Sequence, residues 1–266
     1  MAYKNRVELI PLKFRRIEVG EDVIEILCSL IRRNRLKLKD GDVFAIADKV
    51  LAFYEGRIVD YQNMPVSEDA IRLAKRYNLE PGFVQLVLNE SEKVFGGVER
   101  ALLTLTRGIL MANAGVDHKN APPGKAALWP KNPTLLAYKI RVELEKRFGK
   151  RLAVIIVDSK VNPLRRGTVG IAIGFSGLVP VIDCRGKKDL FGNSLKITFM
   201  NVVDDLAAMA HLLMGETIES TPFVLIRNAP ITLTEENYSD EVKISENDCL
   251  VLNSLKEYYY CPRTGA

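Results

Sequence analysis

The chain has 266 residues, of which 47% are hydrophobic and 27% charged, as is ordinary for a globular protein of one large or two modest domains. Its 38 basic and 33 acidic residues give a net charge of +5, and no aromatic and basic signature indicates nucleic-acid binding. Only two histidines occur, which excludes a three-histidine metal site. Carboxylates, hydroxyls and cationic side chains must therefore carry most of any catalysis.

The four cysteines are scattered without a CxxC pair, which favours buried thiols in a reducing compartment. No apolar run of signal-peptide length opens the chain. The longest uncharged stretch, residues 167–182, is interrupted by four glycines and a proline, so it is too broken to span a bilayer. We expect a cytoplasmic protein that binds neither membrane nor nucleic acid.

The spacing of apolar residues predicts α/β structure, or α+β structure with a mixed sheet. Helices are expected over 22–33, 67–77 with Ser67 as N-cap, 83–92, 133–148 closed by Gly149, and 204–214 ended by Gly215. Strands are expected over 43–47, 101–106, 108–112, 153–157, 195–203 and 223–226. Residues 1–230 should form one domain, either compact or of two interlocked lobes. Residues 231–266 should form an acidic, helical tail that ends in the tyrosines at 258–260.

No GxxxxGK[ST], GxGxxG, HExxH or GxSxG motif is present, but three segments concentrate polar residues. In residues 112–120, which follow a predicted strand, Asp117 and Asn120 offer oxygen ligands, although an ordinary turn explains the segment equally well. Asp158 and Ser159 come at the end of the strand 153–157, where ligands collect in α/β sheets. A carboxylate beside a hydroxyl suits Mg²⁺ or Mn²⁺; the alternative is an Asx turn next to a solvated arginine pair, 165–166.

The third segment runs from Met214 to Thr217 and places Glu216 just after the end of a helix. A surface glutamate is the simpler interpretation of that position. His211, on the preceding helix, is expected to be packed or exposed, not a ligand. Together the three segments indicate metal-assisted chemistry on a phosphate-bearing substrate.

Four segments in this order resemble the coenzyme F420-0:gamma-glutamyl ligase family over residues 10–228: ANAGVDHKN, VIIVDS…RRGTVGIAIGFSG, RGKKDLFGNSL and DDLAA…LLMGE. The segments DGDV, EGRIVD and NESEKV look similar as well. The resemblance implies a compact, two-lobed fold and an intertwined homodimer. It also implies a GTP-dependent ligase that joins L-glutamate to the lactyl carboxylate of a deazaflavin precursor through an acyl phosphate. Mn²⁺ or Mg²⁺ at two sites, with K⁺ as a further cation, would assist the reaction.

The resemblance also implies roles for individual residues. The implied catalytic residues are Asp117, Asp158 and Arg166, and the implied metal ligands are Asp117, Asp158, Ser159 and Glu216. The implied nucleotide-binding residues are Phe14, Arg15, Arg16, Ile17, Asp48, Lys49, Asn120, Met214, Gly215 and Thr217.

Three positions depart from the family pattern. Ala52 and Phe53 stand where a serine and a phosphate-contacting lysine are expected, and Asn162 stands where an arginine is common. Arg15 or Arg16 is one candidate replacement for the missing lysine. Two alternatives therefore stay open: a divergent ligase acting on another carboxylated, phosphate-bearing acceptor, or a homologue that binds nucleotide or metal without turnover.

Overall fold

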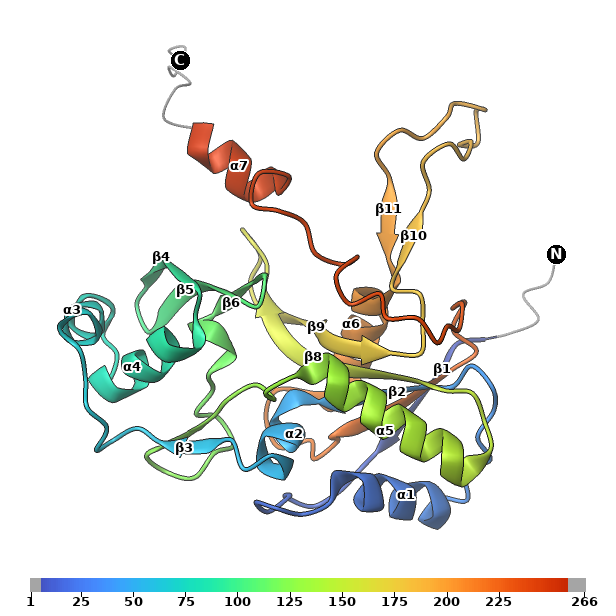
Figure 1. Ribbon diagram of the computed structural model, residues 1–266, viewed down its shortest axis with the longest axis horizontal. Coiled ribbons are helices and arrows are strands. Elements are labelled where there is room, and N and C mark those ends of the chain that lie inside the picture. Colours follow the sequence, from blue (N-terminus) through green and yellow to red (C-terminus); the bar gives the residue numbers. More distant parts are fainter. Residues whose placement is uncertain (1–5, 258–266) are drawn as a thin grey trace.

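The computed structural model describes residues 6–257 and has the mixed α/β organisation expected from the sequence (Figure 1). A five-stranded sheet has the order β1-β12-β2-β8-β9, and smaller sheets pair β4-β5-β6, β3-β7 and β10-β11. The elements are β1 (Glu8–Leu12), α1 (Val23–Arg33), β2 (Val43–Ala47), α2 (Asp48–Tyr54), β3 (Ile58–Asp60), α3 (Glu68–Tyr77), α4 (Pro81–Glu90), β4 (Lys93–Val98), β5 (Ala101–Thr106), β6 (Ile109–Ala112), the 3-10 turn η1 (Asn113–Gly115), β7 (Lys125–Ala127), α5 (Pro133–Phe148), β8 (Ala153–Val161), β9 (Thr168–Ser176), β10 (Val181–Asp183), β11 (Phe199–Asn201), α6 (Val202–Met214), β12 (Phe223–Arg227) and α7 (Leu250–Glu257).

The five-stranded sheet lies between two helical layers. Its central strands β2 and β8 are parallel neighbours and read VFAIA and AVIIV at their paired residues, without polar alternation, because both faces are buried. Phe44 and Ile156 pack on the side of α1 and α5, whereas Ile155 packs with Leu206 of α6. The sheet therefore carries a core on each face.

Local signals set the helix boundaries correctly at several places. The Asp22 carboxylate accepts hydrogen bonds from the first turn of α1, and the Ser67 hydroxyl caps α3. Helix α5 begins after the Asn132 cap and ends at Gly149, whose φ of 64° is left-handed, as expected for a C-terminal glycine. The helices predicted in these three regions are confirmed; the one predicted over 83–92 instead begins at Pro81 and ends at Glu90.

The strand predicted over 195–203 is wrong over most of its length. Only Phe199–Asn201 is a strand, β11, and helix α6 already begins at Val202. The reason is Asn201, whose side chain accepts a hydrogen bond from the Asp204 backbone N–H and so starts the helix two residues earlier than predicted.

Strand β8 is longer than the apolar run 153–157 predicts. It continues to Val161 because residues 157–161 pair antiparallel with β9. Asp158 and Ser159 thus lie within a strand, not after its end. They do, however, lie just beyond the residues that pair with β2. Helix α2, which directly follows β2, was not expected from the sequence.

Two segments extend away from the body of the protein in Figure 1, the β10–β11 hairpin and helix α7. Leu190, Phe191 and Ile197, which lie between the strands of the hairpin, are 86–102% exposed. Helix α7 lies within the predicted tail, while the tyrosines at 258–260 lie outside the described residues. No helix within residues 6–257 is long and apolar enough to cross a membrane.

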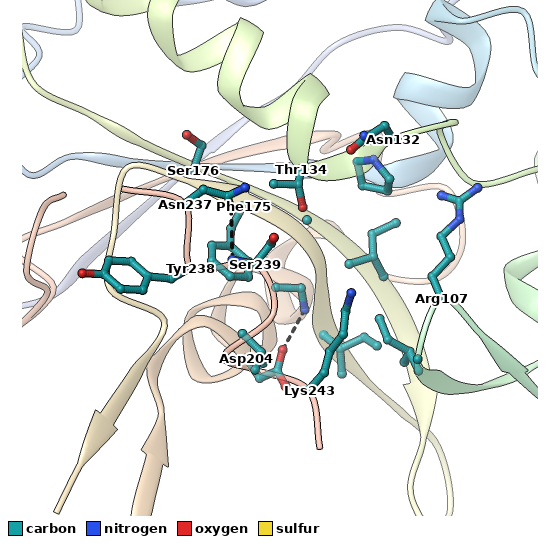
Figure 2. Close-up of a pocket in the computed structure, with 18 of the residues that line it drawn as sticks. Arg107, Asn132, Thr134, Phe175, Ser176, Asp204, Asn237, Tyr238, Ser239 and Lys243 are labelled. Atoms are coloured by element: carbon teal, nitrogen blue, oxygen red, sulfur yellow. Dashed lines mark hydrogen bonds between the residues drawn. The ribbon is translucent and has the colours of Figure 1, made fainter. Parts of the chain in front are cut away.

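Residues of the tail and of β9 line a cavity of about 850 Å³ (Figure 2). The tail begins on β9's side of the sheet, where the Thr234 N–H donates to the Gly177 carbonyl at 3.1 Å, and Glu235 forms an ion pair with buried Arg141 at 2.8 Å. Beyond this anchor the tail separates from β9. The space between them has a mixed lining, which includes the aromatic side chains of Phe175 and Tyr238 and the cationic side chains of Lys160 and Lys243.

Candidate functional site

Two buried aspartates lie where the parallel strands β2 and β8 stop pairing. The last residues that pair are Ala47 of β2 and Val157 of β8. Asp48 and Asp158 are the residues that directly follow them in the sequence. Asp48 is 5% and Asp158 8% exposed. Because the carboxyl ends of parallel strands meet at one edge of a sheet, the fold brings together two carboxylates that are far apart in the sequence.

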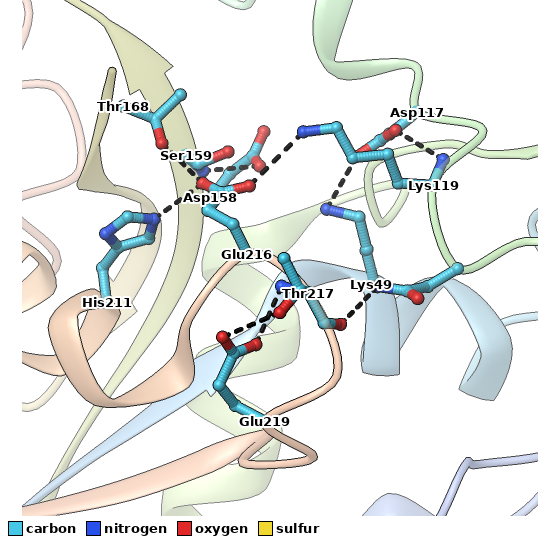
Figure 3. A network of polar contacts seen from close by, with 11 residues as sticks. Lys49, Asp117, Lys119, Asp158, Ser159, Thr168, His211, Glu216, Thr217 and Glu219 are labelled. Carbon is cyan, nitrogen blue, oxygen red and sulfur yellow. Dashed lines mark hydrogen bonds and ion pairs between the residues drawn. The ribbon is translucent and has the colours of Figure 1, made fainter. Parts of the chain in front are cut away.

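Asp117 completes what we call the acidic cluster, defined as Asp48, Asp117 and Asp158. The Lys49 ammonium lies 2.9 Å from the Asp117 carboxylate (Figure 3). Burial disfavours the charged ammonium, but the three carboxylates of the cluster outweigh burial and raise the pKa of Lys49. Burial, followed by repulsion from Asp158, raises the pKa of Asp48 well above its usual range. One ammonium cannot neutralise all three carboxyl groups when they ionise, and Asp48 is the group whose neutral form this arrangement favours most.

Each carboxylate oxygen of Asp158 has a hydrogen-bond donor. The indole Nε1–H of Trp129 donates to Oδ2 at 2.7 Å, and the Ser159 backbone N–H donates to Oδ1 at 2.6 Å. Burial nevertheless raises the pKa of Asp158, although Lys49 and these two donors oppose that rise.

Glu216 lies on the loop after α6, in the same network of polar contacts as Asp117 and Asp158 (Figure 3). Its Oε1 accepts a hydrogen bond from the Thr168 hydroxyl at 2.6 Å and lies 2.9 Å from His211 Nε2; Lys119 Nζ lies 3.4 Å from Oε2. Burial favours the neutral acid, but the contacts with Thr168, His211 and Lys119, and a further one with the Ser159 hydroxyl, lower the pKa of Glu216 to about 2. Glu216 is therefore an ionised carboxylate at neutral pH.

Segments predicted to bind nucleotide converge on the loop 214–221. The Phe14 N–H donates to the Ser220 carbonyl at 3.0 Å, and the Asn120 side chain donates to the Thr217 carbonyl at 3.4 Å. Gly215 has a left-handed φ of 72°, which allows the chain to turn sharply after α6. The tertiary structure thus places the N-terminal segment, the 112–120 segment and this loop beside one another.

Other predicted residues lie elsewhere. Arg15 and Arg16 form exposed ion pairs with Glu21 and Glu18, and Ile17 and Met214 are buried with hydrophobic clusters. Arg166 is exposed in the β8–β9 turn, as is Asn162. No ion pair joins these three arginines to the acidic cluster within the described residues, so their catalytic and nucleotide-binding roles stay predictions.

Phe53, which replaces an expected lysine, has a structural role. It is 8% exposed and packs in the core on the side of α1 and α5. Lys49 precedes it by one turn of α2 and points to the acidic cluster (Figure 3). The cationic side chain of Lys49 therefore lies one helical turn from Phe53, the position at which the family pattern has a lysine.

The predicted metal ligands are not gathered into a ready-made site: residues 6–257 contain no group of three or more His, Cys, Asp or Glu side chains arranged to hold a metal ion. Lys49 lies against one of those ligands, Asp117. The donor chemistry still fits a hard divalent cation, because carboxylate and hydroxyl oxygens are the ligands that Mg²⁺ and Mn²⁺ prefer.

Sequence reasoning missed three side chains that contact the predicted ligands. His211 was expected to be merely packed or exposed, yet it contacts Glu216, five residues later, because Gly215 turns the chain back. Thr168 lies in the segment RRGTVGIAIGFSG but was assigned no role there, and Trp129 lies in none of the segments that carry the resemblance. The available signal was the end of α6, where a histidine in the last turn comes just before Gly215 and Glu216.

Comparison with known proteins extends over most of the chain. The family model described as F420-0:Gamma-glutamyl ligase matches residues 11–228. The Coenzyme F420:L-glutamate ligase of Methanocaldococcus jannaschii is 39% identical over 92% of this chain and 97% of that protein. The protein of the same name from Archaeoglobus fulgidus is 36% identical over 94% of this chain and 98% of its own length, and that from Methanothermobacter thermautotrophicus is 36% identical over 84% and 88%. The chain therefore belongs to the F420-0:gamma-glutamyl ligase family.

Proposed function

We propose that this protein is a GTP- and divalent-metal-dependent ligase that forms an amide between L-glutamate and the carboxylate of the deazaflavin precursor coenzyme F420-0. GTP phosphorylates the acceptor carboxylate to an acyl phosphate with release of GDP, and the glutamate amine then displaces phosphate. The family match supports the ligase and its substrates. The acidic cluster, together with Glu216, is the observation that carries the site assignment.

In this proposal, Asp117, Asp158, Ser159 and Glu216 hold Mn²⁺ or Mg²⁺, with Asp48 adding charge, and K⁺ is a further cation. A metal held there would supply positive charge to neutralise the charge that develops on the phosphate. Lys49 supplies a cation to the phosphates in place of the lysine that Phe53 replaces. The loop 214–221 and Asn120 bind the nucleotide.

We assign the acceptor to the cavity of Figure 2. Its volume of about 850 Å³ lies in the range of small-molecule sites, and its aromatic side chains suit a planar ring system. Ile171, which lines it, pairs with Asp158 across the β8–β9 ladder, and Lys160, also in the lining, lies two residues beyond Asp158. An anionic ring compound bound there would lie next to the strand that carries the cluster. Lys160→Ala should raise the KM for the acceptor and leave that for GTP unchanged.

We further propose that the protein is a two-lobed, intertwined homodimer whose β10–β11 hairpin packs on the partner. The hairpin projects from the body and carries almost fully exposed Leu190 and Phe191, and exposed apolar groups of this kind mark contact surfaces. Replacing both residues by serine should convert dimer to monomer in analytical ultracentrifugation. A wild-type chain that sediments as a monomer would contradict this assignment.

Incubation of the purified full-length chain with GTP, Mn²⁺, L-glutamate and coenzyme F420-0 tests the activity. We expect GDP release and a mass gain of glutamyl units. Asp158→Asn should abolish both, whereas Asp205→Asn, an exposed aspartate on α6, should not. GDP release only with a different carboxylated acceptor would instead identify a divergent ligase. Metal or GTP binding without hydrolysis would indicate a homologue that binds without turnover.

A further inference from the structure

Trp129 is the one tryptophan in the sequence, and it is almost completely buried, with 2% of its surface exposed. Its indole N–H donates to Asp158 Oδ2 at 2.7 Å, while the other carboxylate oxygen accepts from the Ser159 N–H at 2.6 Å. Donors on both oxygens leave the carboxylate one preferred orientation. The indole therefore fixes the direction in which Asp158 presents its remaining lone pairs.

The same ring packs against the segment that leads to Asp117. A Cβ atom added to Gly115 would lie 2.3 Å from the indole, so the backbone there approaches the ring as closely as only glycine permits. Asp117, two residues later, exchanges backbone hydrogen bonds of 3.0 and 2.8 Å with Ala127. Ala127 in turn precedes Trp129 by two residues. Asp117 is thus linked to the indole in two ways: through Gly115, which packs against the ring, and through Ala127, which pairs with Asp117 and lies two residues before Trp129.

The ring itself is held from several sides. Met111 and Ile171 pack with it in a small buried cluster. The Arg107 guanidinium lies 6.0 Å from the ring centre, and the Trp129 carbonyl accepts a hydrogen bond from Arg57 Nε. A side chain restrained in this way has little rotational freedom to lose when a ligand binds nearby.

We propose that Trp129 is a positioning residue that sets the relative placement of Asp158 and Asp117. It holds the Asp158 carboxylate by its N–H, and its ring packs against Gly115, two residues before Asp117. Groups behind metal-binding side chains are known to change metal affinity by about 10–100-fold. The inference rests on the proposed function for one of its measurements, the metal affinity. A second measurement, the rate of hydrogen exchange over residues 112–118, is made without metal.

The test compares Trp129→Phe with Met111→Leu. The first variant removes the N–H and shortens the ring; the second is a nearly volume-conserving change in the same cluster. In metal-free protein, hydrogen exchange followed by mass spectrometry should show faster exchange over residues 112–118 in Trp129→Phe than in Met111→Leu. Mn²⁺ affinity is obtained from the concentration of free Mn²⁺, measured by electron paramagnetic resonance. Trp129→Phe should bind Mn²⁺ about 10–100-fold more weakly than wild type, and Met111→Leu should bind it with wild-type affinity.

The single indole gives a third readout. Its one N–H resonance in a ¹⁵N–¹H spectrum should broaden with Mn²⁺ and shift with diamagnetic Mg²⁺, and Asp158→Asn should remove both effects. If wild-type protein binds no Mn²⁺, the proposed metal site fails, and the exchange comparison still decides the role of Trp129. Equal exchange over residues 112–118 in the two variants would overturn the positioning role.

Discussion

Gly115→Ala is the substitution that most directly tests the packing around the site. Gly115 has a φ of +71°, and an added Cβ would lie 2.3 Å from the Trp129 ring. Two costs follow. An L-residue in left-handed conformation costs about 1–2 kcal/mol, and forcing an extra carbon into a packed core costs about 1–3 kcal/mol. The sum is about 2–5 kcal/mol of unfolding free energy.

Gly149 provides a matched control. Its φ is +64°, close to that of Gly115, but no atom lies within 4 Å of an added Cβ. Gly149→Ala should therefore lower the free energy of unfolding only by the cost of the left-handed conformation, about 1–2 kcal/mol. The difference between the two variants isolates the overlap with the indole, and it should be about 1–3 kcal/mol, or about 2–4 °C in Tm for each kcal/mol in a chain of this size.

Urea unfolding followed by far-UV circular dichroism measures both variants without using the tryptophan signal. Gly115→Ala should also weaken Mn²⁺ binding, because displacing the indole disturbs its hydrogen bond to Asp158, whereas Gly149→Ala should not. Equal loss of stability in both variants would refute the close contact between Gly115 and Trp129. A destabilised Gly115→Ala that still binds Mn²⁺ like wild type would refute its connection to Asp158.

Three further predictions concern charge. Lys49→Met should destabilise the metal-free protein by about 1–3 kcal/mol, because it leaves the buried Asp48 and Asp158 and the partly buried Asp117 without their ammonium. Mg²⁺ should restore part of this stability in urea titrations, and no recovery would argue against a cation there. Asp48 has a raised pKa in the folded chain, so its ionisation costs stability as pH rises through that pKa, and Asp48→Asn should flatten this decline; an unchanged pH profile would contradict the repulsion. For Glu216 the pH dependence of stability has the opposite sign. Its pKa in the folded chain is about 2, below the ordinary 4.5, so its contribution to the stability of the fold is present above pH 4.5 and disappears as pH falls toward 2. Glu216→Gln should therefore lose less stability than wild type across that window.

Much of the secondary structure follows from local sequence. The helices α1, α3 and α5 were predicted from the spacing of their apolar residues, with Ser67 as the cap of α3 and Gly149 as the end of α5. Spacing and capping act between near neighbours in the sequence. The apolar runs of β2, β8 and β12 likewise predicted buried strands, because an uninterrupted apolar run is a local feature of the sequence. The extension of β8 to Val161 was missed because it depends on pairing with β9, and polar residues such as Asp158 carry no strand signal of their own.

The order of the segments that resemble the family was enough to indicate it, and the resemblance named the carboxylates Asp117, Asp158 and Glu216. Only the tertiary structure decided what surrounds them. Lys49 lies against Asp117 because α2 follows β2 directly, and His211 lies against Glu216 because Gly215 turns the chain back. Trp129 reaches Asp158 over a separation of 29 residues. Electrostatic and hydrogen-bond environments depend on distance in space, so the sequence determined which acids are present, and the packing of β2, β8 and the loops determined which charges and donors they meet.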